Sequence, residues 1–256
     1  LLGGMGDSAE NTSDVVASEP TPAAADSNER LSPEESDALG EIANISMGTA
    51  ATTLSVLVNN RVEITTPKLS YVTLDDLKEQ NPAPCVFIYI SYRTGLEGKN
   101  ILVLKEHDVK VITDLMMGGD GTNTDGELGE LHLSAISEAM NQMMGSAATS
   151  LSTLLQTVID ISPPESSLFD LTEVKDGKEI SPFLGGTFVK IAFRMQIDDL
   201  VDSSIMQLYP IDFARKLVET FINTQMANID EVTEKKPAQP ENDTDTTAQI
   251  PAPGTD

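Results

Sequence analysis

Apolar residues recur at helical spacing in two long segments of the chain, over about 33–58 and 128–157. The first segment begins with Ser32-Pro33-Glu34-Glu35, which offers a serine N-cap, a proline in the first turn and a glutamate at the capping-box position. At 100° per residue, its apolar and small side chains cluster on one side, which predicts a helix with a core-facing surface. That surface comprises Leu39, Ile42, Ala43, Ser46, Ala50, Thr53, Leu54 and Leu57.

Shorter runs of β-branched and aromatic residues, bounded by Gly, Pro and Asp, follow each long segment and predict strands. Two amphipathic segments, Asp108–Met117 and Ile211–Gln225, predict a shorter helix at the end of each half. We therefore expect an α+β fold in which helices pack on an antiparallel sheet. The predicted strands are Val62–Thr66, Leu69–Thr73, Val86–Tyr92, Asn100–Lys105, Val158–Ser162, Ser167–Leu171, Thr187–Gln196 and Ser203–Tyr209.

The two halves of this pattern are copies of each other. When the sequence is shifted by 97 positions, Leu31–Pro67 aligns without a gap on Leu128–Pro164. Within it, Met47–Ser55 reads MGTAATTLS and Met144–Ser152 reads MGSAATSLS. Repeats of about 31–117 and 128–225 therefore form one duplicated unit, which we expect to have a pseudo-two-fold axis.

The side of each long helix opposite the core carries a small set of polar residues followed by very small ones. In the first repeat these are Asp37, Glu41 and Asn44, then Gly48, Ala51 and Ser55; in the second they are Ser134, Glu138 and Asn141, then Gly145, Ala148 and Ser152. A glycine inside a helix costs about 1 kcal/mol relative to alanine, so its presence at matching places predicts a close approach to the backbone. Either the two long helices cross there, or a partner docks there, or both interpretations hold together.

The Glu/Asn pair suits one kind of chemistry, although a solvated helix face is the simpler interpretation. A carboxamide both donates and accepts hydrogen bonds without charge, so it is able to orient a water molecule that attacks a phosphoryl group. A glutamate one turn away is able to pair with a lysine or arginine of an incoming protein. The combination favours hydrolysis of a phosphoryl group that another protein carries.

The chain is strongly acidic, and the charge helps to define its organisation. Its 256 residues carry 41 acidic and 16 basic side chains, for a formal net charge of −25. Residues 1–30 and 227–256 each contribute −5 and are rich in Ala, Pro, Ser, Thr and Asp, so we expect flexible linkers there, with frayed termini as the alternative. The folded domain is then expected over 31–226.

This composition excludes several classes of function. A net charge of −25 argues against binding to nucleic acid or to an anionic membrane surface. No apolar run approaches the roughly 18 residues that span a bilayer. The single cysteine, Cys85, rules out an internal disulfide and suits a cytoplasmic protein, and the two histidines, His107 and His132, lack the spacing of metal ligands.

Two stretches of the sequence resemble the doubled signature of a known family. Asp37-x3-Glu41-x2-Asn44-x22-Pro67 and Ser134-x3-Glu138-x2-Asn141-x22-Pro164 resemble the CheC/CheX/FliY phosphatases, which dephosphorylate the chemotaxis response regulator CheY. The resemblance covers about 31–226, and within the family it is greatest to the middle domain of the FliY branch. It implies a duplicated CheC-like domain acting at the flagellar motor switch, on the cytoplasmic face of the flagellar basal body.

The resemblance also assigns roles to individual residues. Asn44 and Asn141 are expected to position the hydrolytic water, and Glu41 and Glu138 to pair with the active-site lysine of CheY. Asp37, Gly48, Ser134 and Gly145 are expected at the docking surface, while Pro67 and Pro164 shape the turn that follows. Mg²⁺ is expected to come from the phosphorylated partner, so this chain needs no cofactor or metal ligand of its own.

The resemblance further implies an assembly and leaves one alternative. In the full-length protein, an N-terminal CheY-binding segment and a C-terminal FliN-like domain are expected around this middle domain, with the switch proteins FliM, FliG and FliN-type proteins as partners. The alternative function is a rotor scaffold whose Glu/Asn pairs only bind CheY or another switch protein. The sequence favours catalysis because both pairs are intact.

Overall fold

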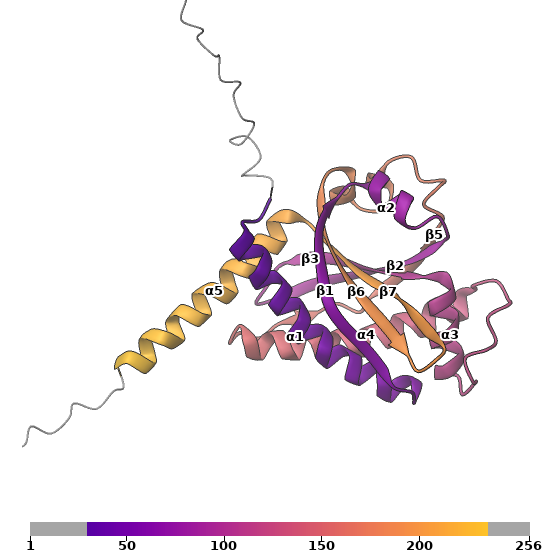
Figure 1. Ribbon diagram of the computed structural model, residues 1–256, viewed down its shortest axis with the longest axis horizontal. Coiled ribbons are helices and arrows are strands. Elements are labelled where there is room, and N and C mark those ends of the chain that lie inside the picture. Colours follow the sequence, from indigo (N-terminus) through magenta and orange to yellow (C-terminus); the bar gives the residue numbers. More distant parts are fainter. Residues whose placement is uncertain (1–29, 235–256) are drawn as a thin grey trace, which may run out of the picture.

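The computed structural model describes residues 30–234, with side chains to residue 227. Most of both predicted linkers, residues 1–29 and 235–256, therefore lies outside the described residues. The last helix, α5, runs from Ile211 to Glu234, so residues 227–234 are helical where the sequence predicts a linker. Figure 1 shows α5 leaving the body of the molecule, while the other long helices lie along the sheet.

A seven-stranded antiparallel sheet forms the centre of the fold, and it confirms the predicted α+β class. The strands follow the order β1-β6-β7-β3-β2-β4, and β5 also pairs with β2. The bounds are β1 Val62–Val72, β2 Cys85–Thr94, β3 Gly98–Lys105, β4 Asp160–Ile161, β5 Glu165–Phe169, β6 Phe188–Ile197 and β7 Val201–Tyr209.

Helices α1, α3 and α4 begin and end close to the predicted residues. The capping box at the start of α1 is confirmed, because the backbone N–H of Glu35 donates to Ser32 Oγ at 3.1 Å and that of Ser32 donates to Glu35 Oε2 at 2.7 Å. The second long helix, α4, is slightly shorter than expected at both ends. The bounds are α1 Pro33–Val58, α2 Leu74–Gln80, α3 Glu106–Met116 and α4 Glu130–Leu154, with 3₁₀ turns η1 Gly177–Glu179 and η2 Pro182–Gly185.

The first strand differs from the prediction, and the helix after it, α2, has no counterpart among the predicted helices. The two predicted strands before and after Pro67 are one strand, β1, whose register with β6 shifts between Thr65 and Lys68. Proline has no N–H, and an edge strand with a bulge is where a sheet accommodates it. The expectation that Pro67 shapes a turn is therefore wrong. In the second repeat, the corresponding stretch is divided into the short strands β4 and β5.

The two halves are related by a pseudo-two-fold axis, and each completes the sheet of the other. Strand β1 of the first half pairs with β6 of the second, and β5 of the second pairs with β2 of the first. At the centre β3 pairs with β7, where Leu102 lies opposite Gln207. Leu102 and Gln207 occupy matching places in their repeats, 105 positions apart. The first residues of α3 and α5 are also 105 positions apart. The repeats therefore form a single domain.

Hydrophobic side chains fill both faces of the sheet. The larger core lies between the sheet and the helices α1, α3, α4 and α5, and the smaller core lies under α2, η1 and η2 and includes Cys85. Burial raises the pKa of the Cys85 thiol to about 11. Helices α1 and α4 lie on the same face of the sheet (Figure 1) and touch where Thr53 Oγ1 donates to Ser146 Oγ at 2.6 Å. Both long helices are thus held on a rigid base.

Candidate functional site

The first Glu/Asn pair lies on the outer surface of α1. Asp37, Glu41 and Asn44 are exposed, and within residues 30–234 none of the three side chains has a hydrogen bond or ion pair. Residues three and four positions apart share a helix face, so these groups form one line along α1. The side chains are free to contact another molecule.

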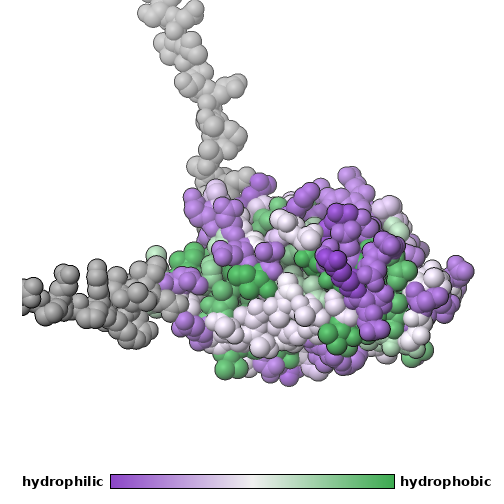
Figure 2. Space-filling model, turned by 60° about the horizontal axis from the view of Figure 1, so that its bottom comes forward, coloured by the Kyte–Doolittle hydropathy of each residue, from purple (hydrophilic) through white to green (hydrophobic). Residues whose placement is uncertain are grey.

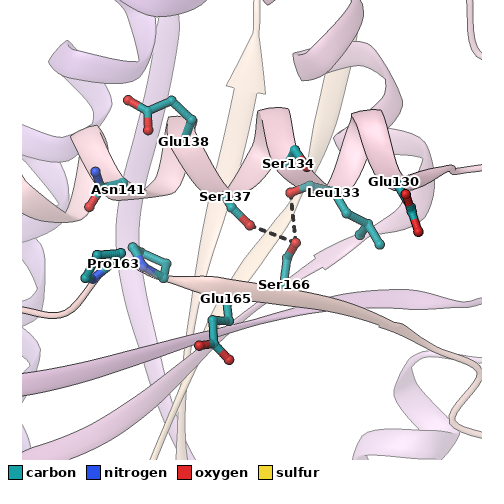
Figure 3. Close-up of a pocket in the computed structure, with 10 residues that line it drawn as sticks. Glu130, Leu133, Ser134, Ser137, Glu138, Asn141, Pro163, Glu165 and Ser166 are labelled. Atoms are coloured by element: carbon teal, nitrogen blue, oxygen red, sulfur yellow. Dashed lines mark hydrogen bonds between the residues drawn. The ribbon is translucent and has the colours of Figure 1, made fainter.

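The second pair lies beside a pocket of about 570 Å³ between α4 and the segment that leads into β5. Ser134 and Glu138 are exposed, whereas Asn141 is half-buried. Figure 3 shows Asn141 next to Pro163, while the carboxylate of Glu138 points away from the strand segment. The pocket is lined by Glu130, Leu133, Ser134, Ser137, Glu138, Asn141, Pro163, Pro164, Glu165 and Ser166.

A pair of serines fixes the wall of this pocket. Ser137 Oγ donates to Ser166 Oγ at 2.8 Å, and Ser166 Oγ donates to the carbonyl oxygen of Leu133 at 2.9 Å. These bonds join the start of β5 to α4 (Figure 3). The first repeat has Gly40 and Leu69 at the serine positions, so it lacks this link.

The first site is anchored by a different residue. The hydroxyl of Tyr71 in β1 accepts a hydrogen bond from the backbone N–H of Leu31 at 3.0 Å and lies 3.4 Å from Ser36 Oγ. The tyrosine therefore ties the start of α1 to the sheet. The two repeats thus hold their long helices with unrelated side chains.

The immediate surroundings of the two glutamates also differ. Gln142 Nε2 donates a hydrogen bond of 2.7 Å to Glu138 Oε1. Ile45 stands at the corresponding position beside Glu41 and offers no donor. A second difference is the charge on the neighbouring strand, where Lys68 in the first repeat corresponds to Glu165 in the second. Three carboxylates of the second repeat, those of Glu130, Glu138 and Glu165, line one pocket.

The strip of small residues is only partly outward-facing. Gly48 is exposed and Gly145 half-exposed, and a Cβ built on either one meets no heavy atom within 4 Å. Ala51 and Ala148, however, are buried, so the prediction that they face outward is wrong. The reason is that the chain turns back over this side of each helix into the next strand.

Two serines at the end of the strip hold that turn. The backbone N–H of Val62 donates to Ser55 Oγ at 2.8 Å, and that of Ile159 donates to Ser152 Oγ at 2.9 Å. The same hydrogen bond between a serine hydroxyl and the backbone is therefore present in both repeats. Because a Cβ at Gly48 or Gly145 would meet no atom of the other long helix within 4 Å, the packing of the two helices does not require glycine at either position. The expectation that a partner docks there stays a prediction.

Small, weakly polar side chains dominate the surface between the two sites. Figure 2 is turned toward the side of the molecule where α1 and α4 lie, and the centre of this face is pale, as expected for Gly, Ser and Thr. The exposed residues of this kind on α1 and α4 are Gly48, Thr49, Thr52, Thr149 and Thr153. Such a surface allows another protein to approach the helix backbones closely.

The described part of the chain offers no cluster of three or more His, Cys, Asp and Glu side chains that could hold a metal ion. His132 Nδ1 instead accepts a hydrogen bond from the backbone N–H of Gly129 at 3.2 Å, at the start of α4. None of the helices within residues 30–234 is long and apolar enough to cross a membrane. The expectation that Mg²⁺ comes from a partner stays a prediction.

The duplicated segment matches a known family model. The CheC-like family model matches residues 34–71 and 131–168, two stretches with the same 97-residue offset, and each contains one Glu/Asn pair. The X-ray crystal structure of Thermotoga maritima FliY superimposes with a TM-score of 0.70 at 41% sequence identity, over 76% of this chain and 99% of that one.

Two curated relatives come from Bacillus subtilis (strain 168). The flagellar motor switch phosphatase FliY is 46% identical over 215 residues, which cover 82% of this chain and 56% of that protein. The CheY-P phosphatase CheC is 26% identical over 140 residues, which cover 53% of this chain and 66% of that protein. The chain thus spans between about half and two thirds of the length of these relatives.

Proposed function

The chain belongs to the CheC-like family, and on this premise we propose that it is a phosphatase that hydrolyses the aspartyl phosphate of the chemotaxis response regulator CheY. The observation that carries the proposal is the duplicated Glu/Asn pair. Each pair lies on a helix packed against the sheet, and in the first pair both side chains are exposed and without partners in the described chain. Two relatives of the chain are named as phosphatases, one of them as a CheY-P phosphatase.

In this proposal Asn44 and Asn141 position the attacking water. The side-chain oxygen of the asparagine accepts a hydrogen bond from the water and orients its lone pair toward phosphorus. The P–O bond to the partner's aspartate breaks as the bond from water forms. A proton of the water passes to the phosphate, so the products are the free aspartate carboxylate and dihydrogen phosphate. A neutral amide serves here because it adds no charge near an anion.

Glu41 and Glu138 then hold the partner in place. Each glutamate lies one helical turn from its asparagine, so a lysine of the partner that pairs with the carboxylate fixes the phosphoryl group relative to the amide. Asp37, Ser134, Gly48 and Gly145 extend the contact along the two helices. The partner contributes the aspartyl phosphate and the Mg²⁺, which neutralises phosphoryl charge as it does in other phosphoryl transfers.

The relatives also support a place of action. We propose that the protein works at the flagellar motor switch, on the cytoplasmic face of the basal body, where FliM, FliG and FliN-type proteins are partners of the full-length protein. The supporting observation is the 46% identity to a flagellar motor switch phosphatase.

Phosphate release from phosphorylated CheY tests the proposal. CheY is phosphorylated with a small phosphodonor, the donor is removed, and a catalytic amount of the chain is added. The proposal predicts many turnovers per chain and loss of phosphate well above the spontaneous rate. Tight binding of phosphorylated CheY without faster phosphate release would instead favour the rotor-scaffold function.

A further inference from the structure

A second polar pocket, of about 370 Å³, lies next to the second Glu/Asn site. The two pockets share Pro163 and Glu165, so they lie on the two sides of the segment that leads into β5. Figure 3 shows the side chain of Glu165 pointing away from α4, toward the side that the second pocket occupies. A protein docked on α4 therefore reaches this pocket by extending around the edge of the sheet.

Two cations line the pocket, Arg93 at the end of β2 and Lys99 in β3. Both side chains are exposed, and within residues 30–234 neither forms an ion pair. The guanidinium of Arg93 donates only to the hydroxyl of Ser162, through Nε. Its other N–H groups are available, and residues 31–226 carry a net charge of −15, so two free cations beside one site are unusual.

Arg93 lies at a β-bulge in strand β2. The pairing of β2 with β4 shifts between Tyr92 and Thr94, so Arg93 is an extra residue in β2. Bulges of this kind re-aim a side chain and are frequent next to active sites. The bulge at the first site, between Thr65 and Lys68, places its extra residue on β1, and β6 pairs regularly with Val62–Thr65, so β6 presents no residue that corresponds to Arg93.

The second cation also has no counterpart at the first site. The hairpins β2–β3 and β6–β7 are equivalent in the two repeats. Their registers place Ser204 of β7 at the position that Lys99 occupies in β3. The nearest cation on β6, Arg194, is neutralised by Asp202, to which its Nε donates at 2.8 Å. The first site instead has an exposed lysine on β1, Lys68, so Arg93 and Lys99 themselves have no counterparts there.

We infer that this pocket binds an acidic side chain of the phosphorylated protein that docks on the second site, an inference that rests on the proposed function. A guanidinium pairs with a carboxylate through two parallel hydrogen bonds, and an ammonium adds a point charge. The hydroxyls of Ser91, Ser162 and Ser181 line the same pocket and are suited to the remaining lone pairs. Glu130, Glu138 and Glu165 repel an acidic partner, and the two cations offset this repulsion.

The test measures binding and hydrolysis separately. CheY carrying beryllium trifluoride in place of the phosphoryl group is titrated against the Glu41→Lys chain, in which the reversed charge repels the partner's lysine and blocks docking at the first site, with and without Arg93→Ala and Lys99→Ala. The inference predicts a Kd that rises roughly two- to fivefold for each cation removed, and a KM for phosphate release that rises equally while kcat is unchanged. Arg93→Lys should retain part of the affinity.

The Glu138→Lys chain, in which docking at the second site is blocked, is the matched control. There the same two substitutions should leave Kd and KM unchanged. The inference is overturned if the substitutions leave Kd unchanged in the Glu41→Lys chain, or if Kd rises equally in both chains. Because Kd is read without hydrolysis, a chain that binds through Arg93 and Lys99 but releases no phosphate supports the pocket while refuting the phosphatase function.

Discussion

Gln142 donates a hydrogen bond from Nε2 to Oε1 of Glu138 over 2.7 Å, whereas the corresponding pair in the first repeat is Ile45 and Glu41. The bond occupies part of the carboxylate that we assign to the partner's lysine. The two sites thus share the Glu/Asn pair but differ in the hydrogen bonding of their glutamates.

We expect the Gln142 bond to compete with docking at the second site. Gln142→Met keeps the length of the side chain and removes the donor, so in the Asn44→Ala chain it should lower the KM for CheY-P about two- to fivefold, at unchanged kcat. The reciprocal variant, Ile45→Gln in the Asn141→Ala chain, should raise KM. An unchanged or higher KM for Gln142→Met would show that the bond does not compete with docking. Steady-state phosphate release provides both constants.

Alanine variants of Gly48 and Gly145 should have opposite effects on the stability of the protein and on its docking to a partner. Each lies inside a helix with open space around its would-be Cβ, so alanine at either position should raise the free energy of unfolding by about 1 kcal/mol. If a partner approaches the backbone there, the added methyl groups should also raise the KM for CheY-P severalfold. Urea unfolding and phosphate release provide the two measurements.

Val56→Ala is the matched control for the glycine variants. Val56 is 77% exposed and lies on α1 beyond the docking residues. Alanine is the better helix former, so the variant should gain a few tenths of a kcal/mol without any change in KM. Glycine variants that are stabilised but keep the parent KM would remove Gly48 and Gly145 from the docking surface.

Asp108 should make the protein less stable as the pH rises. The residue is 3% exposed, its Oδ2 has no hydrogen-bond partner, and burial raises its pKa, an effect that the nearby Ser203 hydroxyl, Lys105 and His107 only partly offset. Its contribution to stability is therefore complete below pH of about 4, near the unfolded-state pKa, and is lost as the pH rises through the folded-state pKa.

Asp108→Asn removes this titration. The variant should match the parent near pH 4, apart from the acid unfolding they share, and be more stable than the parent at pH 7. Urea unfolding across this pH range measures the difference. A parent that gains stability relative to Asp108→Asn between pH 4 and 7 would contradict the assignment.

Features that depend on local sequence could be predicted well. The capping box at Ser32 and the apolar face of α1 depend on residues that are close together in the sequence, and the 97-residue repeat is visible when the sequence is aligned with itself. The structure confirms all three features. The same kind of signal was available for α2, because Thr73 and Asp76 form a capping box. It was obscured by the strand pattern that ends at Thr73.

Features that depend on distant segments could not be predicted. Strand β1 continues through Pro67 because the pairing with β6 tolerates a bulge at the edge of the sheet, which the sequence near Pro67 does not reveal. Ala51 and Ala148 are buried by a turn that a helical projection leaves out. The contacts of Ser137 with Ser166 likewise appear only once β5 lies beside α4.

The most direct test of the account is the loss of phosphate from CheY-P in the presence of the Asn44→Ala/Asn141→Ala chain. Binding is measured in parallel with CheY carrying beryllium trifluoride. If the asparagines orient the attacking water, the double variant should lose about 100-fold or more of the rate enhancement while its Kd stays within about a factor of three of the parent's. Each single variant should keep the activity of the site that is left. Hydrolysis by the double variant at the parent's rate would contradict the account.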